Sequence, residues 1–275
     1  MNIFEIILLQ PLANGLILFY KILGQNMGLA IIGFSLFLRV ILNPLTKPYM
    51  ESMKKMKDVA PQLDKLKKKH EGDKGKLMQA QAEFYRQKGV NPGAGCLPYL
   101  LQIVILIAFF NVFVRTLSAN GEGVGRFNEL LYSPLRFRQE ETINTKFLYL
   151  DVSKPDTFKI DVLPFELPGP ILILAALVQL ASAKIMAPYA EAQEKAAKKT
   201  AGQRDDMQAA MQKSTTYMIP AFTIIFGMKF ASGLALYWFL FSFSQAYQQY
   251  RTSGWGGMTP FIKKLGLLKS NAESK

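Results

Sequence analysis

One arginine stands in the middle of an apolar stretch, and its position is the most informative feature of the sequence. Arg39 follows FSLFL and precedes VIL. An arginine at the centre of a membrane costs about 2.5–3.5 kcal/mol on insertion scales, so such residues usually face a polar cavity or a partner. Ser35 and Asn43 lie four residues to either side, which places all three on one face of a helix. This polar stripe predicts a water-containing groove.

The alternative is that Arg39 extends along its own aliphatic stem to the membrane surface. The nearer end of the apolar stretch is about two helical turns away, which favours the groove. The five most apolar stretches of the chain contain no Asp or Glu. A positive charge in that setting is suited to attracting an acidic group rather than to relaying protons, and it argues against a pump or an ion-coupled transporter.

Polar residues in the other apolar stretches could line the same groove. They are Gln102, Gln179, Ser182 and Thr223. An isolated Gln or Ser in a membrane helix more often bonds to a neighbouring helix, so each of them is a weak indication by itself. Tyr237 and Trp238 either line the groove or belong to an aromatic belt at the membrane surface.

Five stretches are apolar enough to cross a membrane, which takes roughly 20 residues in a helix. They are approximately 27–48, 97–115, 169–187, 214–230 and 234–250. The short connection between the last two predicts an antiparallel helical hairpin. Residues 3–23 are also apolar but contain Pro11, Asn14 and Gly15. We expect them to form a helix in the membrane interface with its polar residues toward water and head groups, and a sixth span is the alternative.

The distribution of Lys and Arg predicts the orientation of the spans. With five spans, segments 47–91, 188–213 and 251–275 share one side and carry 22 Lys and Arg residues, against 6 in segment 116–167 on the other side. Cytoplasmic loops are enriched in Lys and Arg. The C-terminus is therefore expected in the cytoplasm, and the N-terminus and segment 116–167 outside.

The sequence thus predicts an all-α polytopic membrane protein with three parts. An interfacial helix occupies residues 1–26, a core with five transmembrane helices occupies 27–250, and a basic cytoplasmic tail occupies 251–275. The tail is suited to anionic lipid or to ribosomal RNA. The external segment is rich in Gly, Pro and mixed charge, so little regular structure is expected there. Its glycines at 121, 123 and 125 follow no strand and open no helix, which predicts a flexible loop.

Segment 50–88 has the pattern of a cytoplasmic helical hairpin with two amphipathic arms. Gly72 and Gly75 are expected to separate the arms, and Pro61 should kink the first arm or divide it in two. The first arm begins with methionines at helical spacing, namely Met50, Met53 and Met56. These side chains either offer an adaptable surface to varied hydrophobic partners or simply pack the two arms together.

Cofactor chemistry has little support in the sequence. The single cysteine, Cys96, cannot form an internal disulfide, and the single histidine, His70, leaves no His-based metal site. No removable signal peptide is evident at the N-terminus. We therefore expect neither a metal nor a cofactor.

Four stretches resemble one known family. FLRVILNPLTKPYMESMKKM (37–56) is similar to the Arg-bearing first core span of the YidC/Oxa/Alb family and the start of its cytoplasmic hairpin. KGVNPGAGCLPYLLQ (88–102) resembles the pattern with which the family begins its next span. MIPAFTIIFG (218–227) and SGLALYWF (232–239) resemble its last two spans. The order and spacing agree from about residue 5 to residue 250.

The resemblance implies a membrane protein insertase, which is not an enzyme. It implies a five-helix core around a hydrophilic groove that opens to the cytoplasm and to lipid and is closed on the outside. In such a groove Arg39 would attract acidic, exported segments of client proteins. Residues 3–23 match the interfacial helix of the family, and the mobile cytoplasmic hairpin matches 50–88.

The partners implied are nascent membrane proteins and the lipid bilayer, with the ribosome and the Sec translocon as candidates and no small-molecule substrate. We expect a monomer in the bacterial cytoplasmic (inner) membrane. The chain departs from the family in two ways: the large folded external domain of Gram-negative members is missing, and Ala231 stands where a Pro often precedes the last turn. The second departure is expected to loosen the last hairpin. Two other functions compete: a small-solute channel or transporter, and a membrane-bound assembly scaffold.

Overall fold

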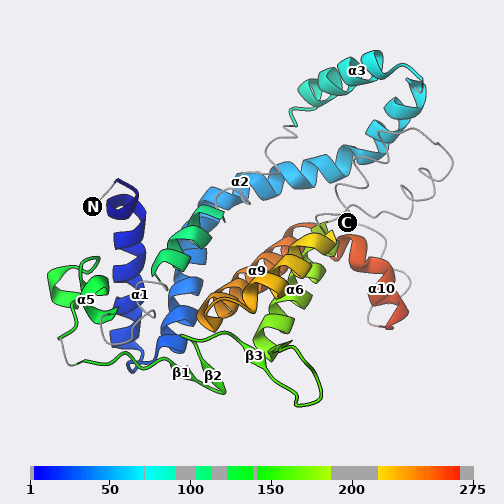
Figure 1. Ribbon diagram of the computed structural model, residues 1–275. Helices are drawn as coiled ribbons and strands as arrows, with labels where there is room; N and C mark the ends of the chain where they lie inside the picture. The colour runs from blue at the N-terminus through cyan, green and yellow to red at the C-terminus, as the bar shows by residue number, and fades with distance from the viewer. Residues whose placement is uncertain are drawn as a thin grey trace. The chain divides into compact units, whose positions relative to one another are not determined.

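Most of the described chain is helical (Figure 1). The computed structural model describes residues 3–70, 72–90, 103–112, 123–138, 141–186 and 216–266. The helices are η1 (Glu5–Leu9, a π-helix), α1 (Gln10–Ile22), α2 (Met27–Lys69), α3 (Lys74–Gln87), Ile103–Val112, α5 (Gly123–Asn128), η3 (Ser133–Leu135), α6 (Pro170–Met186), Thr216–Gly227, α9 (Ser232–Ser253), η4 (Gly256–Met258) and α10 (Thr259–Lys264). The strands are β1 (Lys146–Phe147), β2 (Leu150–Asp151), β3 (Thr157–Phe158) and β4 (Leu167–Pro168).

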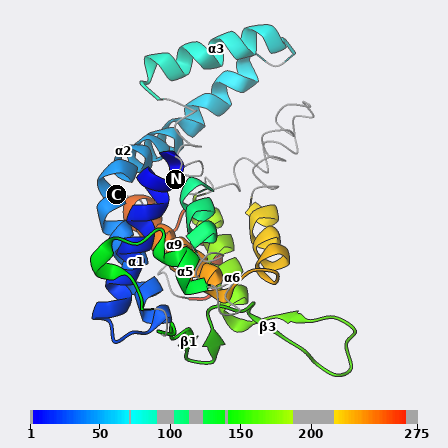
Figure 2. The ribbon, with the colours of Figure 1, turned by 60° about the vertical axis from the view of Figure 1, so that its left-hand side comes forward.

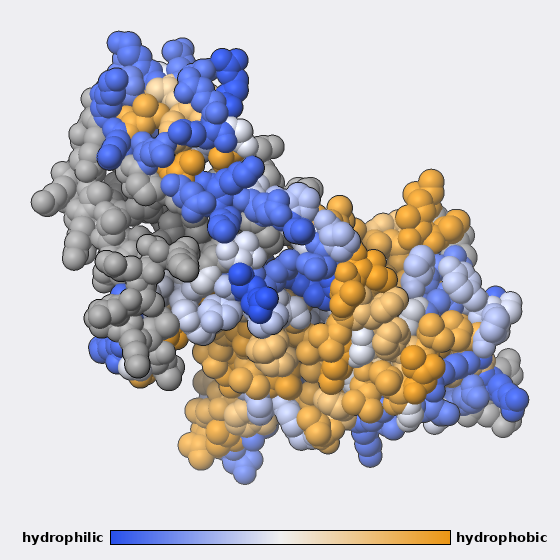
Figure 3. All heavy atoms as spheres, turned by 180° about the vertical axis from the view of Figure 1, so that it is seen from behind, coloured by the Kyte–Doolittle hydropathy of each residue, from blue (hydrophilic) through white to orange (hydrophobic). Residues whose placement is uncertain are grey.

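The chain divides into two compact units. The first comprises Met1–Asn43, Tyr99–Val178 and Pro220–Ser244. The second comprises Pro44–Pro98, Gln179–Ile219 and Gln245–Lys275. Seen from behind, hydrophobic side chains gather over the helices of the first unit, whereas hydrophilic side chains predominate over α3 and the later part of α2 (Figure 3). This contrast is the one expected of an apolar bundle and a cytoplasmic hairpin.

Two helices of the described chain are long and apolar enough to cross a membrane, namely Glu5–Ile22 and Met27–Pro48. Three shorter apolar helices, Ile103–Val112, Pro170–Ile185 and Thr216–Gly227, lie inside the stretches expected to span. The helical conformation predicted for the described parts of these stretches is confirmed, and α9 covers the fifth. The number of five crossings stays a prediction.

The first helix packs closely on the second. Gly15 of α1 faces Phe34 of α2, and a Cβ added to this glycine would collide with the ring. Phe19 follows one turn later, and its ring centroid is 5.7 Å from that of Phe34 and 5.4 Å from that of Phe37. The small residue therefore lets the two helices approach, and the aromatic rings fill the space beside it.

The polar residue in the middle of α1 does not face water. Asn14 is only 4% exposed. Its side-chain amide donates to the carbonyl oxygen of Leu130 at 2.9 Å, and its oxygen accepts from the backbone N–H of Tyr132 at 2.7 Å. The prediction that the polar residues of 3–23 face water and head groups is therefore wrong for Asn14, because its amide bonds to Leu130 and Tyr132. These two residues belong to segment 116–167, which is predicted to be external and is called the external segment below. The interfacial position of the helix stays a prediction.

α2 is a single helix of 43 residues. It runs without interruption from the apolar stretch through Pro61 to Lys69, so of the two effects predicted for Pro61, a kink or a division of the first hairpin arm, the division is not found. A proline removes one backbone hydrogen bond, and the helix continues on the remaining ones. The reversal comes at Gly72, whose φ of +99° suits glycine. Gly75, expected to help separate the arms, instead lies in the first turn of α3.

The external segment has more structure than expected, although its elements are short. Gly123 and Gly125 lie in a six-residue helix, α5, so the prediction of a flexible loop that opens no helix is wrong for these two, and Gly121 lies outside the described residues. β1 pairs antiparallel with β2, and β3 pairs antiparallel with β4. The segment also contributes buried apolar side chains to the same hydrophobic core as α1 and α2: Phe127, Leu130, Leu131, Phe137, Leu150 and Val152. Composition did not reveal this because the apolar residues are interspersed with Gly, Pro and charged residues and follow no helical or strand period.

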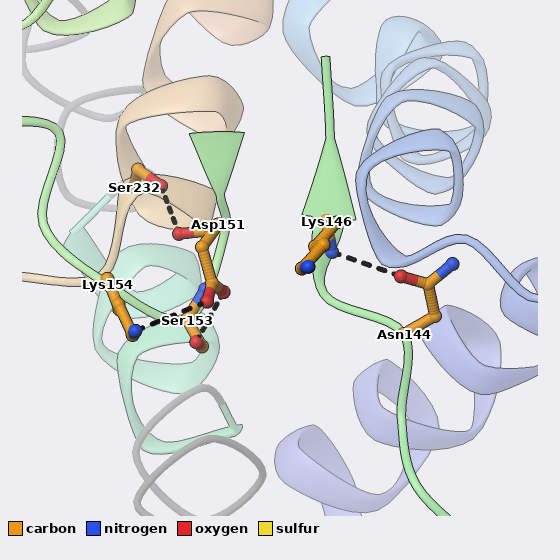
Figure 4. Close-up of polar contacts among 6 residues, drawn as sticks. All are labelled: Asn144, Lys146, Asp151, Ser153, Lys154 and Ser232. Atoms are coloured by element: carbon orange, nitrogen blue, oxygen red, sulfur yellow. Dashed lines mark hydrogen bonds and ion pairs between the residues drawn. The ribbon is translucent and has the colours of Figure 1, made fainter. Parts of the chain in front are cut away.

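The external segment also holds the start of α9 (Figure 4). The hydroxyl of Ser232 donates to the carbonyl oxygen of Asp151 at 2.9 Å. The backbone N–H of Ser232 donates to the carbonyl oxygen of Lys154. The N–H of Gly233 donates to the carbonyl oxygen of Val152 at 3.0 Å. The first N–H groups of a helix lack partners within the helix, and here the external segment supplies them.

Candidate functional site

Arg39 makes a defined contact inside the first unit. Its guanidinium carbon lies 5.1 Å from the centroid of the Phe241 ring. A guanidinium within about 6 Å of an aromatic face is attracted by the electron density of the ring. Arg39 belongs to α2 and Phe241 to α9, so the two helices converge where the charge lies. The side chain of Arg39 is half-buried.

A row of aromatic rings continues from this contact. The ring of Tyr237, one turn before Phe241 on α9, lies 6.3 Å from the Phe241 ring. It stacks on Phe109 of helix Ile103–Val112, with centroids 4.5 Å apart and 19° between the planes. Tyr237 is 3% exposed, and Trp238 beside it is also buried. This burial argues against the alternative of an aromatic belt at the membrane surface, and the alternative that the two residues line the groove stays a prediction.

Ser35 and Asn43 share a face of α2 with Arg39, as their spacing predicted. Ser35 is 7% exposed, and its hydroxyl is a buried side-chain oxygen with no hydrogen-bond partner among the described residues. Asn43, by contrast, is exposed. The stripe therefore changes from a buried hydroxyl through a half-buried cation to an exposed amide along about two turns of helix.

The other polar residues predicted for the groove have different surroundings. Thr223 is buried in helix Thr216–Gly227 of the first unit. Gln179 and Ser182 belong to the second unit, where the hydroxyl of Ser182 donates to Oε1 of Gln249 on α9 at 3.0 Å. This is the ordinary helix-to-helix bond of a membrane serine. Gln102 lies outside the described residues.

The hairpin methionines lie on α2, and their side chains lie outside the described part of the structure. α3 begins at Lys74, after Asp73, whose carboxylate accepts from the backbone N–H of Lys76 at 3.0 Å. This hydrogen bond and the one from the Lys76 side chain lower the pKa of Asp73. The second arm thus starts at a capped helix end.

Sequence reasoning missed two members of these contacts, Phe241 and Gln249. Phe241 follows Tyr237 by four residues, so the two rings share a helix face. That spacing was a usable signal. The pairing of Gln249 with Ser182 spans 67 residues of sequence and has no local signal.

The arrangement around Arg39 is suited to electrostatic attraction rather than to covalent chemistry. It offers one cation, one buried hydroxyl and several aromatic faces. Within the described ranges, no three His, Cys, Asp or Glu side chains come together as a metal site would require. An opposite charge about 4 Å from a cation gains about 4 kcal/mol at an effective dielectric of 20.

Comparison with known proteins identifies relatives of this chain. The profile described as "60Kd inner membrane protein" matches residues 18–255. A protein of Fusobacterium nucleatum named "Membrane protein insertase YidC" is 30% identical over 225 residues, which cover 82% of this chain and 85% of that one. "Membrane protein insertase YidC 2" of Bacillus anthracis is 29% identical over 244 residues, covering 86% and 77%.

Some relatives are much longer than this chain. A "Membrane protein insertase YidC" of Caulobacter vibrioides is 40% identical over 109 residues, which are 40% of this chain but only 18% of that protein. The profile match and the Fusobacterium alignment both extend over most of the sequence described above. The chain therefore belongs to the 60Kd inner membrane protein family.

Proposed function

We propose that this protein is a membrane protein insertase that moves short polar segments of client proteins across the bilayer and releases their helices into lipid. The contact that supports the proposal most is that of Arg39 with Phe241, which keeps a cation in place on the apolar part of α2. The names of the relatives point the same way. Nascent membrane proteins are the substrates in this proposal, and no bond is made or broken.

The physical task of an insertase is to carry polar groups through hydrocarbon. Each backbone or charged group that loses water without a new partner costs several kcal/mol. A groove that stays wet part of the way into the membrane shortens the dry path. Arg39 offsets the dehydration of an acidic segment, and the exposed Asn43 lies on the same helix face nearer to the expected cytoplasmic end. Burial of the client's apolar helix in lipid then drives the process.

The proposal includes a groove formed in the first unit by the stripe on α2, by Thr223, and by Tyr237 and Trp238 on α9. Gln102, Gln179 and Ser182 stay candidates from the sequence. The hairpin with Met50, Met53 and Met56 is proposed to capture clients. The ribosome and the Sec translocon are candidate partners, and the protein is proposed to act as a monomer.

Five crossings, with the N-terminus outside and the C-terminus in the cytoplasm, belong to the same proposal. The Lys and Arg distribution supports them. Single cysteines introduced after replacing Cys96 would be tested with an impermeant thiol reagent on intact cells. Labelling within 123–138 and protection near the C-terminus are expected. The opposite pattern would refute the orientation, and protection of an N-terminal cysteine would show that residues 3–23 span.

The decisive experiment is a client series graded in the charge of its translocated segment. Arg39→Ala is expected to reduce insertion of acidic segments about tenfold or more, which corresponds to about 1.4 kcal/mol, while neutral and basic segments change little. Arg39→Lys should retain much of the yield, because a positive charge is needed rather than bidentate geometry. Arg138→Ala is the matched control, since it removes an exposed arginine from the external segment. Yields are normalised to the amount of protein in the membrane.

Two outcomes would overturn the proposal. Equal loss for every client with Arg39→Ala, together with reduced abundance of the protein, would mean that Arg39 is only structural. Saturable flux of a small solute through vesicles, with no insertion activity, would favour the channel instead.

A further inference from the structure

Two turns of the external segment present large apolar side chains to the surroundings. In the turn between β1 and β2, Leu148 is 83% exposed and the ring of Tyr149 is more than half exposed. The turn between β3 and β4 exposes Val162 to 88%, together with Ile160 and Phe165. Exposed apolar groups that cluster in this way mark a site of contact with a protein or with a membrane.

The backbone at Leu148 gives a second, independent observation. Its φ is +53°, in the left-handed region that Gly and Asn adopt at low cost and that a branched apolar residue rarely adopts. Strain of this kind persists where the side chain or the conformation serves a purpose. A leucine that is both strained and exposed contributes little to folding. We therefore attribute its presence to a contact with a partner outside the fold.

Hydrogen bonds tie the first turn and the base of the β3–β4 hairpin to the first turn of α6. The hydroxyl of Tyr149 accepts from the backbone N–H of Ile171 at 3.0 Å and donates to Oδ1 of Asp156 at 3.3 Å. Oδ2 of Asp156 accepts from the backbone N–H of Leu172 at 2.9 Å. The backbone carbonyl of Asp156 accepts from the N–H of Gly169. Asp156 itself is buried. The first turn and the base of the β3–β4 hairpin are therefore both attached to the start of α6, and β3 lies beside that end of the helix in both views (Figures 1 and 2).

The helix that they adjoin has an apolar exposed side. α6 starts two residues after β4, and Ile173, Leu174 and Leu177 are exposed along it. In the proposed orientation this end of α6 lies at the outer surface of the bilayer, so the apolar turns continue a surface that already faces lipid. Charged residues between the apolar ones of the second turn, Lys159, Asp161 and Glu166, suit the head-group level rather than the hydrocarbon interior.

We propose that these two turns, residues 148–149 and 158–165, form an interfacial anchor that dips into the head-group and acyl boundary of the outer leaflet. The partner is the lipid bilayer, and the anchor fixes the height at which α6 enters it. The inference rests on the external placement of this segment in the proposed function. It adds a lipid-binding surface that the groove around Arg39 does not require.

The test uses the full chain with Cys96→Ser and one introduced cysteine, labelled with the polarity-sensitive dye NBD and reconstituted in phosphatidylcholine–phosphatidylglycerol vesicles. The anchor predicts three results for labels at Leu148→Cys, Val162→Cys and Phe165→Cys. Their emission lies at shorter wavelength than that of the dye in water, doxyl-labelled lipid quenches it, and iodide does not. Glu141→Cys, an exposed position of the same segment, is the matched control and should be quenched by iodide alone.

Strong iodide quenching at positions 148, 162 and 165 without quenching by lipid would overturn the anchor. Protection from both quenchers would overturn it too, because a protein partner or a second copy would then cover the turns. Since labelling could alter the fold, Leu148→Asn supplies a second measurement on the chain labelled at Val162. Asparagine tolerates this φ but is polar, so lipid quenching at Val162 should fall at least twofold while hydrogen exchange of the segment stays unchanged.

Failure of the anchor and failure of the proposed function give different results. Vesicles that insert acidic clients in an Arg39-dependent way but show no lipid quenching would refute only the anchor. Labelling of the control cysteine from the cytoplasmic side would refute the orientation on which both rest.

Discussion

The guanidinium of Arg39 lies over the ring of Phe241, 5.1 Å from its centroid, so an aromatic face of α9 meets the cation on the apolar part of α2. An aromatic ring attracts a guanidinium through the electron density of its face and carries no net charge of its own. The contact therefore positions the guanidinium beside α9.

Fluorination of Phe241 provides a graded test of that contact. Each fluorine withdraws electron density from the ring face and weakens its attraction for a cation with little change in shape. Replacing Phe241 by mono-, di- and trifluorophenylalanine is expected to lower the insertion of acidic clients step by step, by roughly two- to tenfold in total, corresponding to about 0.5–1.4 kcal/mol. Fluorinated Phe243, an exposed ring on the same helix, is the control. A flat series at Phe241 would show that the ring acts only by packing.

Asn14 should contribute strongly to the stability of the first unit. Asn14→Ala leaves the carbonyl of Leu130 and the N–H of Tyr132 without this partner, which costs about 1–3 kcal/mol for a buried pair. The measurement is the free energy of unfolding in detergent together with hydrogen exchange at residues 128–132. Leu18→Ala, an exposed position on the same helix, should change both much less. Equal effects of the two variants would contradict the role assigned to Asn14.

The external segment should loosen in acid through Asp151. Burial raises the pKa of this carboxyl, but hydrogen bonds from Ser153 and Thr145 and the charge of Lys154 outweigh it, so the pKa is lowered. A carboxyl with a lowered pKa in the folded state stabilises above its unfolded pKa of about 3.9, and this contribution is lost as the pH falls through the lower value. Hydrogen exchange at residues 146–154, corrected for the intrinsic rate, should therefore accelerate below about pH 4. Asp151→Asn should remove that dependence, and the exposed Asp161→Asn should leave it intact.

The cytoplasmic hairpin should exchange its backbone hydrogens faster than the bundle. Most described side chains of α3 are exposed or half-buried, and low burial permits local opening. Amides of α3 are expected to exchange at least tenfold faster than those of α9 at residues 234–240. Replacing residues 70–90 by a short linker should slow client insertion more than it lowers the amount of folded protein. Equal protection of α3 and α9 would contradict this prediction.

The apolar helices could be predicted from the sequence because a membrane requires long runs of apolar residues, and such runs are local. The common face of Ser35, Arg39 and Asn43 could also be predicted, because helical spacing is local too. The continuity of α2 could not be predicted. The effect of Pro61 depends on whether the helical hydrogen bonds around it persist, and sequence alone does not decide that.

The contacts of the external segment could not be predicted for a different reason. Asn14 bonds to residues 116 and 118 positions away, and its own neighbours in the sequence give no sign of them. The hydrogen bond of Ser182 to Gln249 likewise joins residues far apart in the sequence. In both pairs a polar side chain on an apolar helix was correctly recognised as needing a partner, but the partner is set by tertiary packing.

The partners that the external segment offers to the helices are mostly backbone atoms. The carbonyls of Leu130, Lys146 and Asp151 and the N–H groups of Tyr132 and Asn144 bond to side chains of the helices or their ends, namely Asn14, Asn26, Ser232 and Tyr20. The carbonyls of Val152 and Lys154 accept from the backbone N–H groups of Gly233 and Ser232. Every residue carries the same backbone groups, so exchange of an exposed polar side chain in this region leaves these hydrogen bonds in place. Natural variation should therefore be tolerated at the exposed polar positions of the segment and restricted at those four helix positions and at the buried apolar residues of the segment.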